Sequence, residues 1–343
     1  MSKKAMIAQV KKFLFFCFFF LSLANLIGCS KKSYFDTYVE RLENLLGETI
    51  QKPRNLISSS FPRQVVANKK NSVTSINLLD FLALQPCKLQ LIIAQRNSAL
   101  GKVALESQKL INELLFLNLA QECLDRLGPN DQLLKEKIRE SILKKKGDLP
   151  LTIARATLGG PEYKEMWSSS VGGLFFDSKG ILALNYIRKR SENWLEGIYQ
   201  LEDLELEDNL SVLRSAPLAQ YMRQLLRVNY YLQKLTVLIQ EEHRREGFCR
   251  GGVVTNKGII LRNLVEAYFT KASLNEINIA SRGSSEFLFE IQELNQLLFD
   301  VLTESYKDFF TGQFLVLRQS KKILKEHSAV LEPIVFGCES PIS

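Results

Sequence analysis

The sequence is poor in histidine, with only His243 and His327 among its 343 residues. It has no nucleophile elbow, no His-rich metal box and no adjacent Cys–His pair, which are patterns that often mark hydrolases and metalloenzymes. No two cysteines have the CxxC spacing of a redox or zinc site. The sequence therefore favours a non-enzymatic protein, and we expect neither a cofactor nor a bound metal.

Both histidines lie in charged helical segments near a helix end, so each is expected to be exposed rather than paired in a metal site. Carboxylate pairs such as Glu192 and Glu196 are one helical turn apart and would suit acid–base cleavage of a glycan. Such pairs are common on charged helices, which makes a solvated helix face the simpler interpretation. Glycan cleavage stays open as an alternative to a non-enzymatic role.

The chain also lacks a strong excess of charge once its first residues are set aside. Residues 1–28 contain four lysines and no acidic residue, so their removal lowers the formal net charge from +8 to +4. A nearly balanced chain gives no electrostatic reason to expect nucleic-acid binding.

What the sequence does contain is a complete export signal at its start. Four lysines precede and flank an apolar run from Phe13 to Leu23, and Gly28 then supplies the small residue before a cleavage point. Leu26-Ile27-Gly28-Cys29 resembles the processing box of bacterial lipoproteins, in which the cysteine receives a diacylglyceryl group and becomes the new N-terminus. Residues 1–28 are therefore predicted to be a cleaved signal peptide. Cys29 is predicted to carry acyl chains such as palmitate at the start of a tether over residues 29–34.

This lipid is expected to hold the protein at a membrane. An uncleaved spanning helix is the alternative, but the run from Phe13 to Ile27 is shorter than the roughly 20 residues needed to cross a bilayer. Two or three acyl chains anchor stably where a single chain binds only marginally. Ser30 follows the cysteine, whereas Asp at that position resembles the signal for inner-membrane retention. We expect an anchor in the inner leaflet of the outer membrane, facing the periplasm.

Four further cysteines remain in the exported chain: Cys87, Cys123, Cys249 and Cys338. Their even number indicates two disulfides with three possible pairings, and four buried thiols are the alternative. One straight helix over residues 87–123 would separate its ends by about 54 Å at 1.5 Å per residue, whereas bridged Cα atoms lie within about 7 Å. A Cys87–Cys123 bond therefore requires a hairpin that turns near residues 97–101. We favour that pairing, with Cys249–Cys338 as its complement, and one long helix with another pairing is the alternative.

Apolar residues recur mostly at helical spacing. Ser33 and Asp36 form a capping signal for a first helix that ends at Gly47. Further helices are predicted over residues 76–84, 131–146, 181–197, 201–213, 217–246, 259–271, 285–302 and 305–331. Pro86 is expected to open a helix and Pro333 to stop the last one. The fold class is therefore an all-α multi-helix bundle over residues 35–343.

Two segments stand out within this helical pattern. Residues 110–120 form the most apolar helix, which is expected at the centre of the core. Residues 147–180 are rich in Gly, Pro and Ser and follow three lysines that suit a helix end, so we expect a domain boundary or a lid there. Trp167, Phe175 and Phe176 in this range would either line a binding groove or anchor a loop to the core.

The sharpest candidate for a binding site is a polar stretch between two strongly apolar segments. Arg96, Asn97 and Ser98 would be costly to bury unless they find partners or open into a cleft. With Lys102 they would suit an anionic ligand beside Gly101, where glycine permits close approach of the backbone.

The alternative for this stretch is a turn or a polar network without a ligand. Lys102, Glu106, Lys109 and Glu113 alternate in charge at helical spacing, which is typical of a solvated helix face.

The same stretch carries a family resemblance. The residues concerned are Cys87, Arg96-Asn97-Ser98, Leu100-Gly101-Lys102-Val103, Ser107-Gln108 and Cys123, behind a lipoprotein box. They resemble an uncharacterised family of Gram-negative lipoproteins, domain-of-unknown-function family 3080. The resemblance implies no activity, substrate or site residue.

Three hypotheses for function follow. We predict a lipid-anchored adapter or accessory binding protein, which would recognise another envelope protein through an exposed apolar patch near residues 148–180. A cell-wall glycan enzyme would instead need two carboxylates facing each other across a cleft. Binding of an anionic small molecule or lipid head group would need Arg96 and Lys102 to converge in one pocket.

Overall fold

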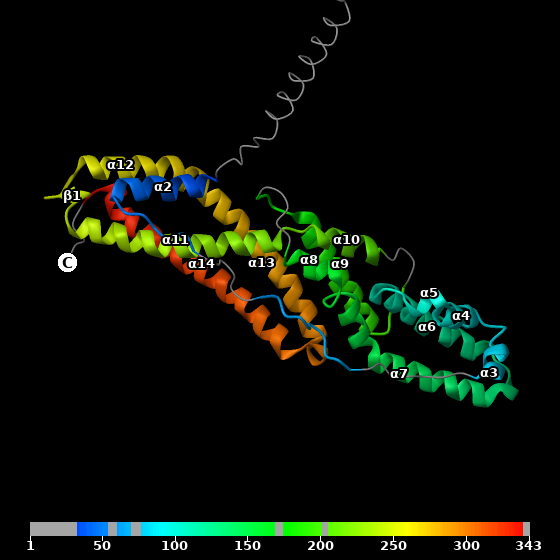
Figure 1. The fold of residues 1–343 in the computed structure, drawn as a ribbon. Helices are drawn as coiled ribbons and strands as arrows, with labels where there is room; N and C mark the ends of the chain where they lie inside the picture. Colours follow the sequence, from blue (N-terminus) through cyan, green and yellow to red (C-terminus); the bar gives the residue numbers. More distant parts are fainter. Residues whose placement is uncertain (1–32, 54–59, 70–76, 169–173, 201–204, 339–343) are drawn as a thin grey trace, which may run out of the picture.

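The computed structural model describes residues 33–53, 60–69, 77–168, 174–200 and 205–338, which form an elongated assembly of helices (Figure 1). The predicted signal peptide and the lipoprotein box with Cys29 lie outside these ranges. Among the described residues, none of the helices combines the length and the apolar character that crossing a membrane requires.

The all-α fold class is confirmed. The α-helices are α2 (Tyr34–Leu46), α3 (Leu78–Ala83), α4 (Leu89–Asn97), α5 (Ala99–Lys102), α6 (Glu106–Arg126), α7 (Gln132–Ala156), α8 (Pro161–Met166), α9 (Ser178–Leu195), α10 (Leu206–Arg214), α11 (Leu218–Arg244), α12 (Asn256–Leu264), α13 (Leu274–Leu297) and α14 (Glu304–Phe336). The other elements are the 3₁₀ turns η1 (Pro129–Asp131) and η3 (Phe299–Val301), the π-helical turn η2 (Val265–Ser273), and a hairpin of β1 (Cys249–Arg250) and β2 (Val253–Val254).

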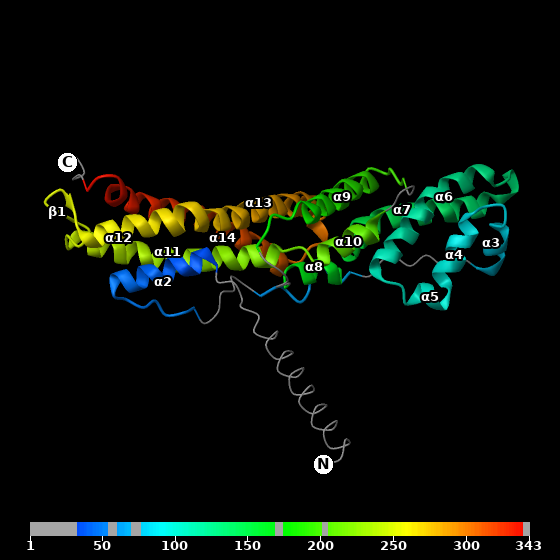
Figure 2. The ribbon, with the colours of Figure 1, turned by 90° about the horizontal axis from the view of Figure 1, so that it is seen from above.

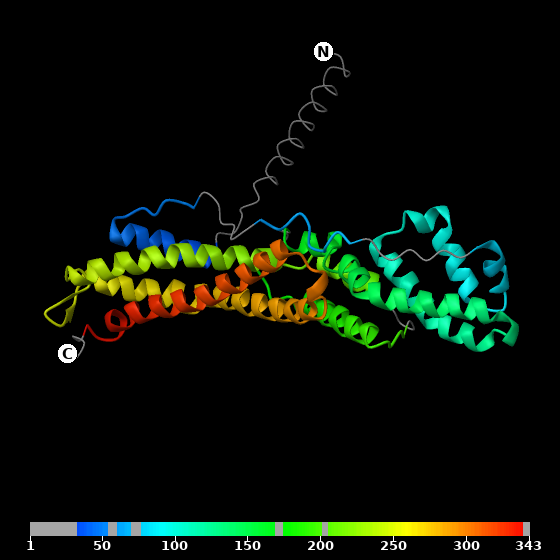
Figure 3. The same ribbon diagram turned by 90° about the horizontal axis from the view of Figure 1, so that it is seen from below.

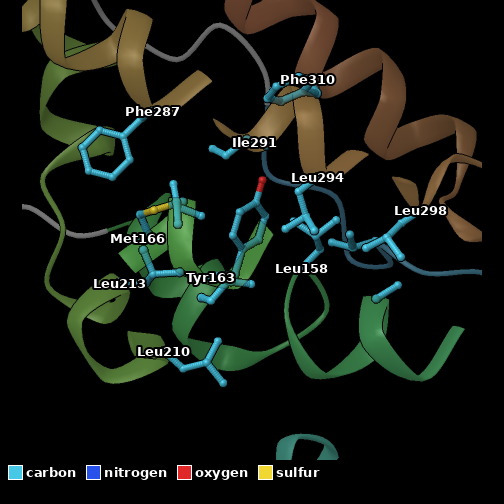
Figure 4. Close-up of a cluster of buried hydrophobic side chains, with 14 of the residues drawn as sticks. Leu158, Tyr163, Met166, Leu210, Leu213, Phe287, Ile291, Leu294, Leu298 and Phe310 are labelled. Atoms are coloured by element: carbon cyan, nitrogen blue, oxygen red, sulfur yellow. The ribbon is translucent and has the colours of Figure 1, made fainter. Parts of the chain in front are cut away.

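The hydrophobic core is divided into three clusters along the molecule. Helices α3 to α7 lie at one end and α2, α12 and the β-hairpin at the other, as Figure 2 and the opposite view in Figure 3 show. The central cluster joins α8, α10 and α13, with Tyr163, Met166 and Phe287 close together (Figure 4). The expectation that the most apolar helix is central holds only in part. Helix α6 belongs to the α3 end of the molecule, and its opposite faces bury residues in two clusters, Leu114 in the central one and Phe116 in the end one.

Both favoured disulfides are present. Cys87 and Cys123 are bonded with their Cα atoms 5.3 Å apart, and Cys249 and Cys338 with theirs 5.4 Å apart. The first bond closes the expected hairpin, in which α4 and α6 run in opposite directions and the chain turns through α5. The second ties the end of α14 to the β-hairpin. The chain is therefore stapled near both ends of the molecule.

Three proline and glycine predictions were wrong. Helix α7 continues through Gly147 and Pro150 to Ala156, and α14 continues past Pro333 to Phe336. The helix predicted to open at Pro86 begins at Leu89 instead. In α7, burial of Leu149 and other apolar side chains in the central cluster outweighs the low helix propensity of Gly and Pro. The continuous helix α7 thus connects the α3 end of the molecule to the central cluster.

The range 147–180 is partly helical where it is described, with turns and irregular segments between its helices. Residues 147–156 complete α7 and residues 161–166 form α8, while residues 169–173 lie outside the described part. Trp167 anchors this segment to the core, with its ring 5.0 Å from that of Phe309. Phe175 is the one large apolar side chain that is exposed among residues 148–168 and 174–180. These described residues therefore do not form the exposed apolar patch that the adapter hypothesis expected.

His327 was expected to be exposed, but it is fully buried between three helices. Its Nε2 lies 2.8 Å from the Tyr38 hydroxyl on α2, and its Nδ1 lies 2.8 Å from the Thr236 hydroxyl on α11. Because the Thr236 hydroxyl donates to the Leu232 carbonyl, it accepts from Nδ1–H, and Tyr38 donates to Nε2. The neutral imidazole thus satisfies every partner. His243 is half-buried on α11 and takes no part in this network.

We predict that this histidine makes the fold sensitive to acid. Burial lowers the pKa of His327 to about 3, below its ordinary value of 6.5. As the pH falls below 6.5, the unfolded chain binds a proton that the folded protein excludes, so stability decreases. The loss attributable to His327 is about 2 kcal/mol between pH 7.5 and pH 5.

Urea unfolding of the wild type and of His327→Gln at both pH values measures this effect. Between pH 7.5 and pH 5, the free energy of unfolding should fall by about 2 kcal/mol more for the wild type than for the variant. Equal losses would show that His327 does not cause the acid sensitivity.

Candidate functional site

Two adjoining cavities lie at the α3 end of the molecule. The first encloses about 370 Å³ between α4, α6 and α7. Seven of its thirteen lining residues are apolar, such as Ile92, Phe116 and Ile138, and the other six are polar or charged, including Lys137 and Lys145. The second encloses about 320 Å³ and is lined mainly by charged side chains. Arg96, Asn97 and Asn112 line both cavities, so the two share a polar boundary. An apolar space and a charged space are thereby placed side by side.

The turn between α4 and α6 positions the residues predicted for this site. The Ser98 hydroxyl accepts a hydrogen bond from the Gly101 N–H and donates one to the Gln95 carbonyl, so it caps α5. A Cβ on Gly101 would lie 2.3 Å from the Gln95 oxygen and 2.5 Å from the Arg96 oxygen. Only glycine allows α5 to pack this closely against the end of α4, a helix-packing role that differs from the close approach to a ligand that the sequence suggested.

The structure brings three of the four predicted site residues together. Arg96, Asn97 and Lys102 all line the second cavity, whereas Ser98 lines neither and has a structural role. Lys102 is exposed at the edge, and Arg96 is about half exposed. The convergence required by the anionic-ligand hypothesis is therefore present.

Glu113 is the charged centre of the site. Its Oε1 lies 3.2 Å from Arg96 Nη1, and its Oε2 contacts the Nζ of Lys145 from α7. The Glu113 and Lys145 side chains are 14% and 9% exposed, so the pair is largely removed from water. The expectation of a fully solvated charge stripe was thus wrong at Glu113, because α7 covers that face of α6.

Lys145 is held between an anion and an aromatic ring. Its Nζ lies 4.5 Å from the centre of the Phe116 ring and donates to Glu113. Burial lowers the pKa of Lys145, the Glu113 carboxylate opposes that shift, and the Arg96 charge adds to it. An ammonium group with a lowered pKa therefore lies at the inner boundary of the first cavity.

Sequence reasoning missed Lys145, which was read as part of a solvated lysine run at a helix end. The missed signal was the helical period of α7. Continued through Gly147, it places Lys145 on the same face as Leu134, Ile138 and Leu149, all of which are buried.

The other predicted chemical groups are engaged elsewhere. Glu192 lies 3.5 Å from Arg188, and neither Glu192 nor Glu196 lines either cavity. Over the described part of the chain, no group of three or more His, Cys, Asp or Glu side chains is arranged to hold a metal ion.

We predict that Glu113 contributes to stability far more than its neighbour Glu106. The change Glu113→Gln leaves Lys145 buried without its counter-charge and should lower the free energy of unfolding by about 3 kcal/mol. The matched change Glu106→Gln breaks a half-exposed pair with Lys109 and should cost less than about 1 kcal/mol. Urea denaturation of both variants measures the difference, and equal costs would refute a buried charge centre.

Comparison with known proteins places the chain in a family. No curated protein and no solved structure matches it. A family model does match residues 35–274, which include the Cys87–Cys123 hairpin, both cavities and most of the central cluster. The chain therefore belongs to the family described as "Protein of unknown function (DUF3080)".

Proposed function

We propose that this protein binds an amphipathic anion, such as a fatty acid or another singly charged lipid, in the two cavities at its α3 end. The observation that carries this proposal is the shared boundary of an apolar and a cationic cavity at Arg96. An amphipathic anion has an apolar chain and a charged group in one molecule, so it is the class of ligand that can occupy both cavities at once.

The apolar cavity suits an acyl chain. Its volume of about 370 Å³ lies within the range of roughly 300–1,000 Å³ that small-molecule sites occupy. Burying an apolar chain there is favourable because it removes hydrocarbon surface from water.

The second cavity suits the anionic group of the ligand. Its lining includes four cationic residues, Arg96, Lys102, Lys109 and Arg155, against two acidic residues, Glu106 and Glu113. Glu106 is already paired with Lys109, and Glu113 with Arg96 and Lys145. The lining thus has a net positive charge that favours an anion, and Arg96 offers a fork geometry for a carboxylate or phosphate.

Binding accounts for this geometry better than glycan cleavage does. A glycosidase needs one carboxyl group that can donate a proton and a second that acts as base or nucleophile. Glu106 and Glu113 line the same cavity, but both oxygens of Glu113 are engaged by cations. They are therefore poorly placed to attack or protonate a sugar.

A serine–lysine hydrolase is likewise disfavoured. Ser141 and Lys145 line the first cavity one helical turn apart. A base in such a pair must accept the serine proton, whereas the ammonium of Lys145 donates to Glu113.

The proposal includes the envelope location predicted from the sequence. A lipid on Cys29 would hold the body beside a membrane, because only three residues separate Cys29 from the first described residue, Ser33. An envelope adapter role remains a prediction. Among the described residues of the range on which it rested, Phe175 is the one exposed large apolar side chain, which gives it no added support.

We predict that Arg96→Ala weakens the binding of dodecanoate about tenfold or more, because a charge-assisted hydrogen bond contributes about 1.5–3 kcal/mol. Isothermal titration calorimetry of the unacylated chain beginning at Ser30 measures the affinity. The matched control is Arg126→Ala, which removes an exposed arginine paired with Glu122 on the same α6 hairpin.

The chemistry of the ligand is tested in the same assay. Dodecanol should bind more weakly than dodecanoate because it lacks the charge, and inorganic phosphate should bind weakly because it lacks the chain. The proposal is wrong if the wild type binds none of these, or if Arg96→Ala and Arg126→Ala bind dodecanoate equally.

A further inference from the structure

Exposed apolar side chains gather beside the charged cavity. Leu100, Val103 and Leu105, in and just after α5, are 82%, 78% and 64% exposed. Lys102 lies between them and is also exposed. We call these four residues the α5 wedge. Gly101 and Lys102 line the second cavity, so the wedge lies at its edge.

The chemistry of the wedge and its surroundings matches an anionic lipid surface. Residues 81–105 contain three cations, Lys88, Arg96 and Lys102, and no acidic residue. Short amphipathic segments that bind at a membrane interface combine apolar side chains with nearby Lys or Arg. Each cation close to anionic head groups adds to the attraction.

Size argues against a stable protein interface at this place. A specific interface buries about 800 Å² on each partner. Three apolar side chains and one lysine in and just after a four-residue helix are too few to form such an interface, whereas binding to a membrane surface scales with the apolar area and positive charge that a segment offers and has no minimum of this kind.

The position of the wedge in the fold agrees with a bilayer as its partner. In Figure 2, α2 and α5 lie on the same side of the molecule, and the opposite view in Figure 3 agrees. Helix α2 begins at Tyr34, five residues after Cys29. A membrane that holds the lipid of Cys29 therefore faces the side on which α5 lies.

We propose that the α5 wedge docks the cavity-bearing end of the protein on the anionic surface of a lipid bilayer. Leu100, Val103 and Leu105 enter the head-group region, and Lys102 contacts lipid phosphates. This inference goes beyond the proposed function and depends on it only for the passage of an amphiphile from the bilayer into the cavities.

Vesicle flotation tests the docking without the covalent lipid. The chain beginning at Ser30 keeps every described residue, and the vesicles are of phosphatidylethanolamine with phosphatidylglycerol, or of phosphatidylcholine alone. The wild type should float with the anionic vesicles. The double variant L100S/V103S should bind them about tenfold or more weakly, and Lys102→Gln about fivefold more weakly.

The matched control is Leu182→Ser, which removes another exposed leucine, 66% exposed, from α9. It should float like the wild type. Because Leu100 and Val103 line neither cavity, L100S/V103S should keep the wild-type affinity for dodecanoate, which shows that it is folded and separates this inference from the proposed function.

A second measurement reports insertion directly. An environment-sensitive fluorophore on Val103→Cys should become brighter and blue-shifted with anionic vesicles, whereas the same label on Leu182→Cys should not change. The inference is overturned if the wild type does not float or if L100S/V103S floats equally well. It is also overturned if sedimentation shows a wild-type dimer that this variant dissociates, since a second copy would then cover the wedge.

Discussion

The disulfide between Cys87 and Cys123 is the constraint on which the cavity-bearing end depends. It joins the residues just before α4 to the last part of α6, so the chain between them must reverse direction. That reversal places Arg96, at the end of α4, against Glu113 in the middle of α6. Closing a loop of this length contributes about 4 kcal/mol in the loop-entropy model. Without this bond, packing, the Ser98 cap and the Arg96–Glu113 ion pair would have to hold the site.

A buried charge cluster then converts this hairpin into a site with two environments. Glu113 is reached from one side by Arg96 of the hairpin and from the other by Lys145 of α7. Charges in a largely water-free place must be paired, which fixes the spacing of α4, α6 and α7. Most of the apolar side chains lie on one side of the cluster, in the first cavity, and a net positive set of charged side chains lies on the other, in the second. Because α7 continues without a break into the central cluster, this geometry is tied to the rest of the molecule.

Features that depend on local sequence could be predicted. Features that depend on contacts between residues far apart in the sequence could not. The first helix, Tyr34–Leu46 with Ser33 and Gly47 as its caps, and the two disulfides follow from spacing and local chemistry. Gly147 and Pro150 lie inside α7 because burying the apolar residues around them in the central cluster stabilises the helix. Local helix propensity does not include this free energy of burial. His327 and Glu113 were assigned to solvent because the partners that enclose them, Tyr38 and Thr236 for His327 and Lys145 for Glu113, lie at least 32 residues away in the sequence. Continuing the periodicity of α7 through Gly147 would have recovered Lys145.

The central claim is that an acyl chain occupies the apolar cavity while its charged group lies beside Arg96. The most direct measurement is photolabelling with a fatty acid that carries a diazirine on its chain, followed by peptide mass spectrometry. The account predicts labelled peptides from α4, α6 and α7, at side chains such as Ile92, Phe116 and Ile138, with competition by unlabelled fatty acid. Labelling that resists competition, or that falls mainly on α8, α13 or α14, would contradict it.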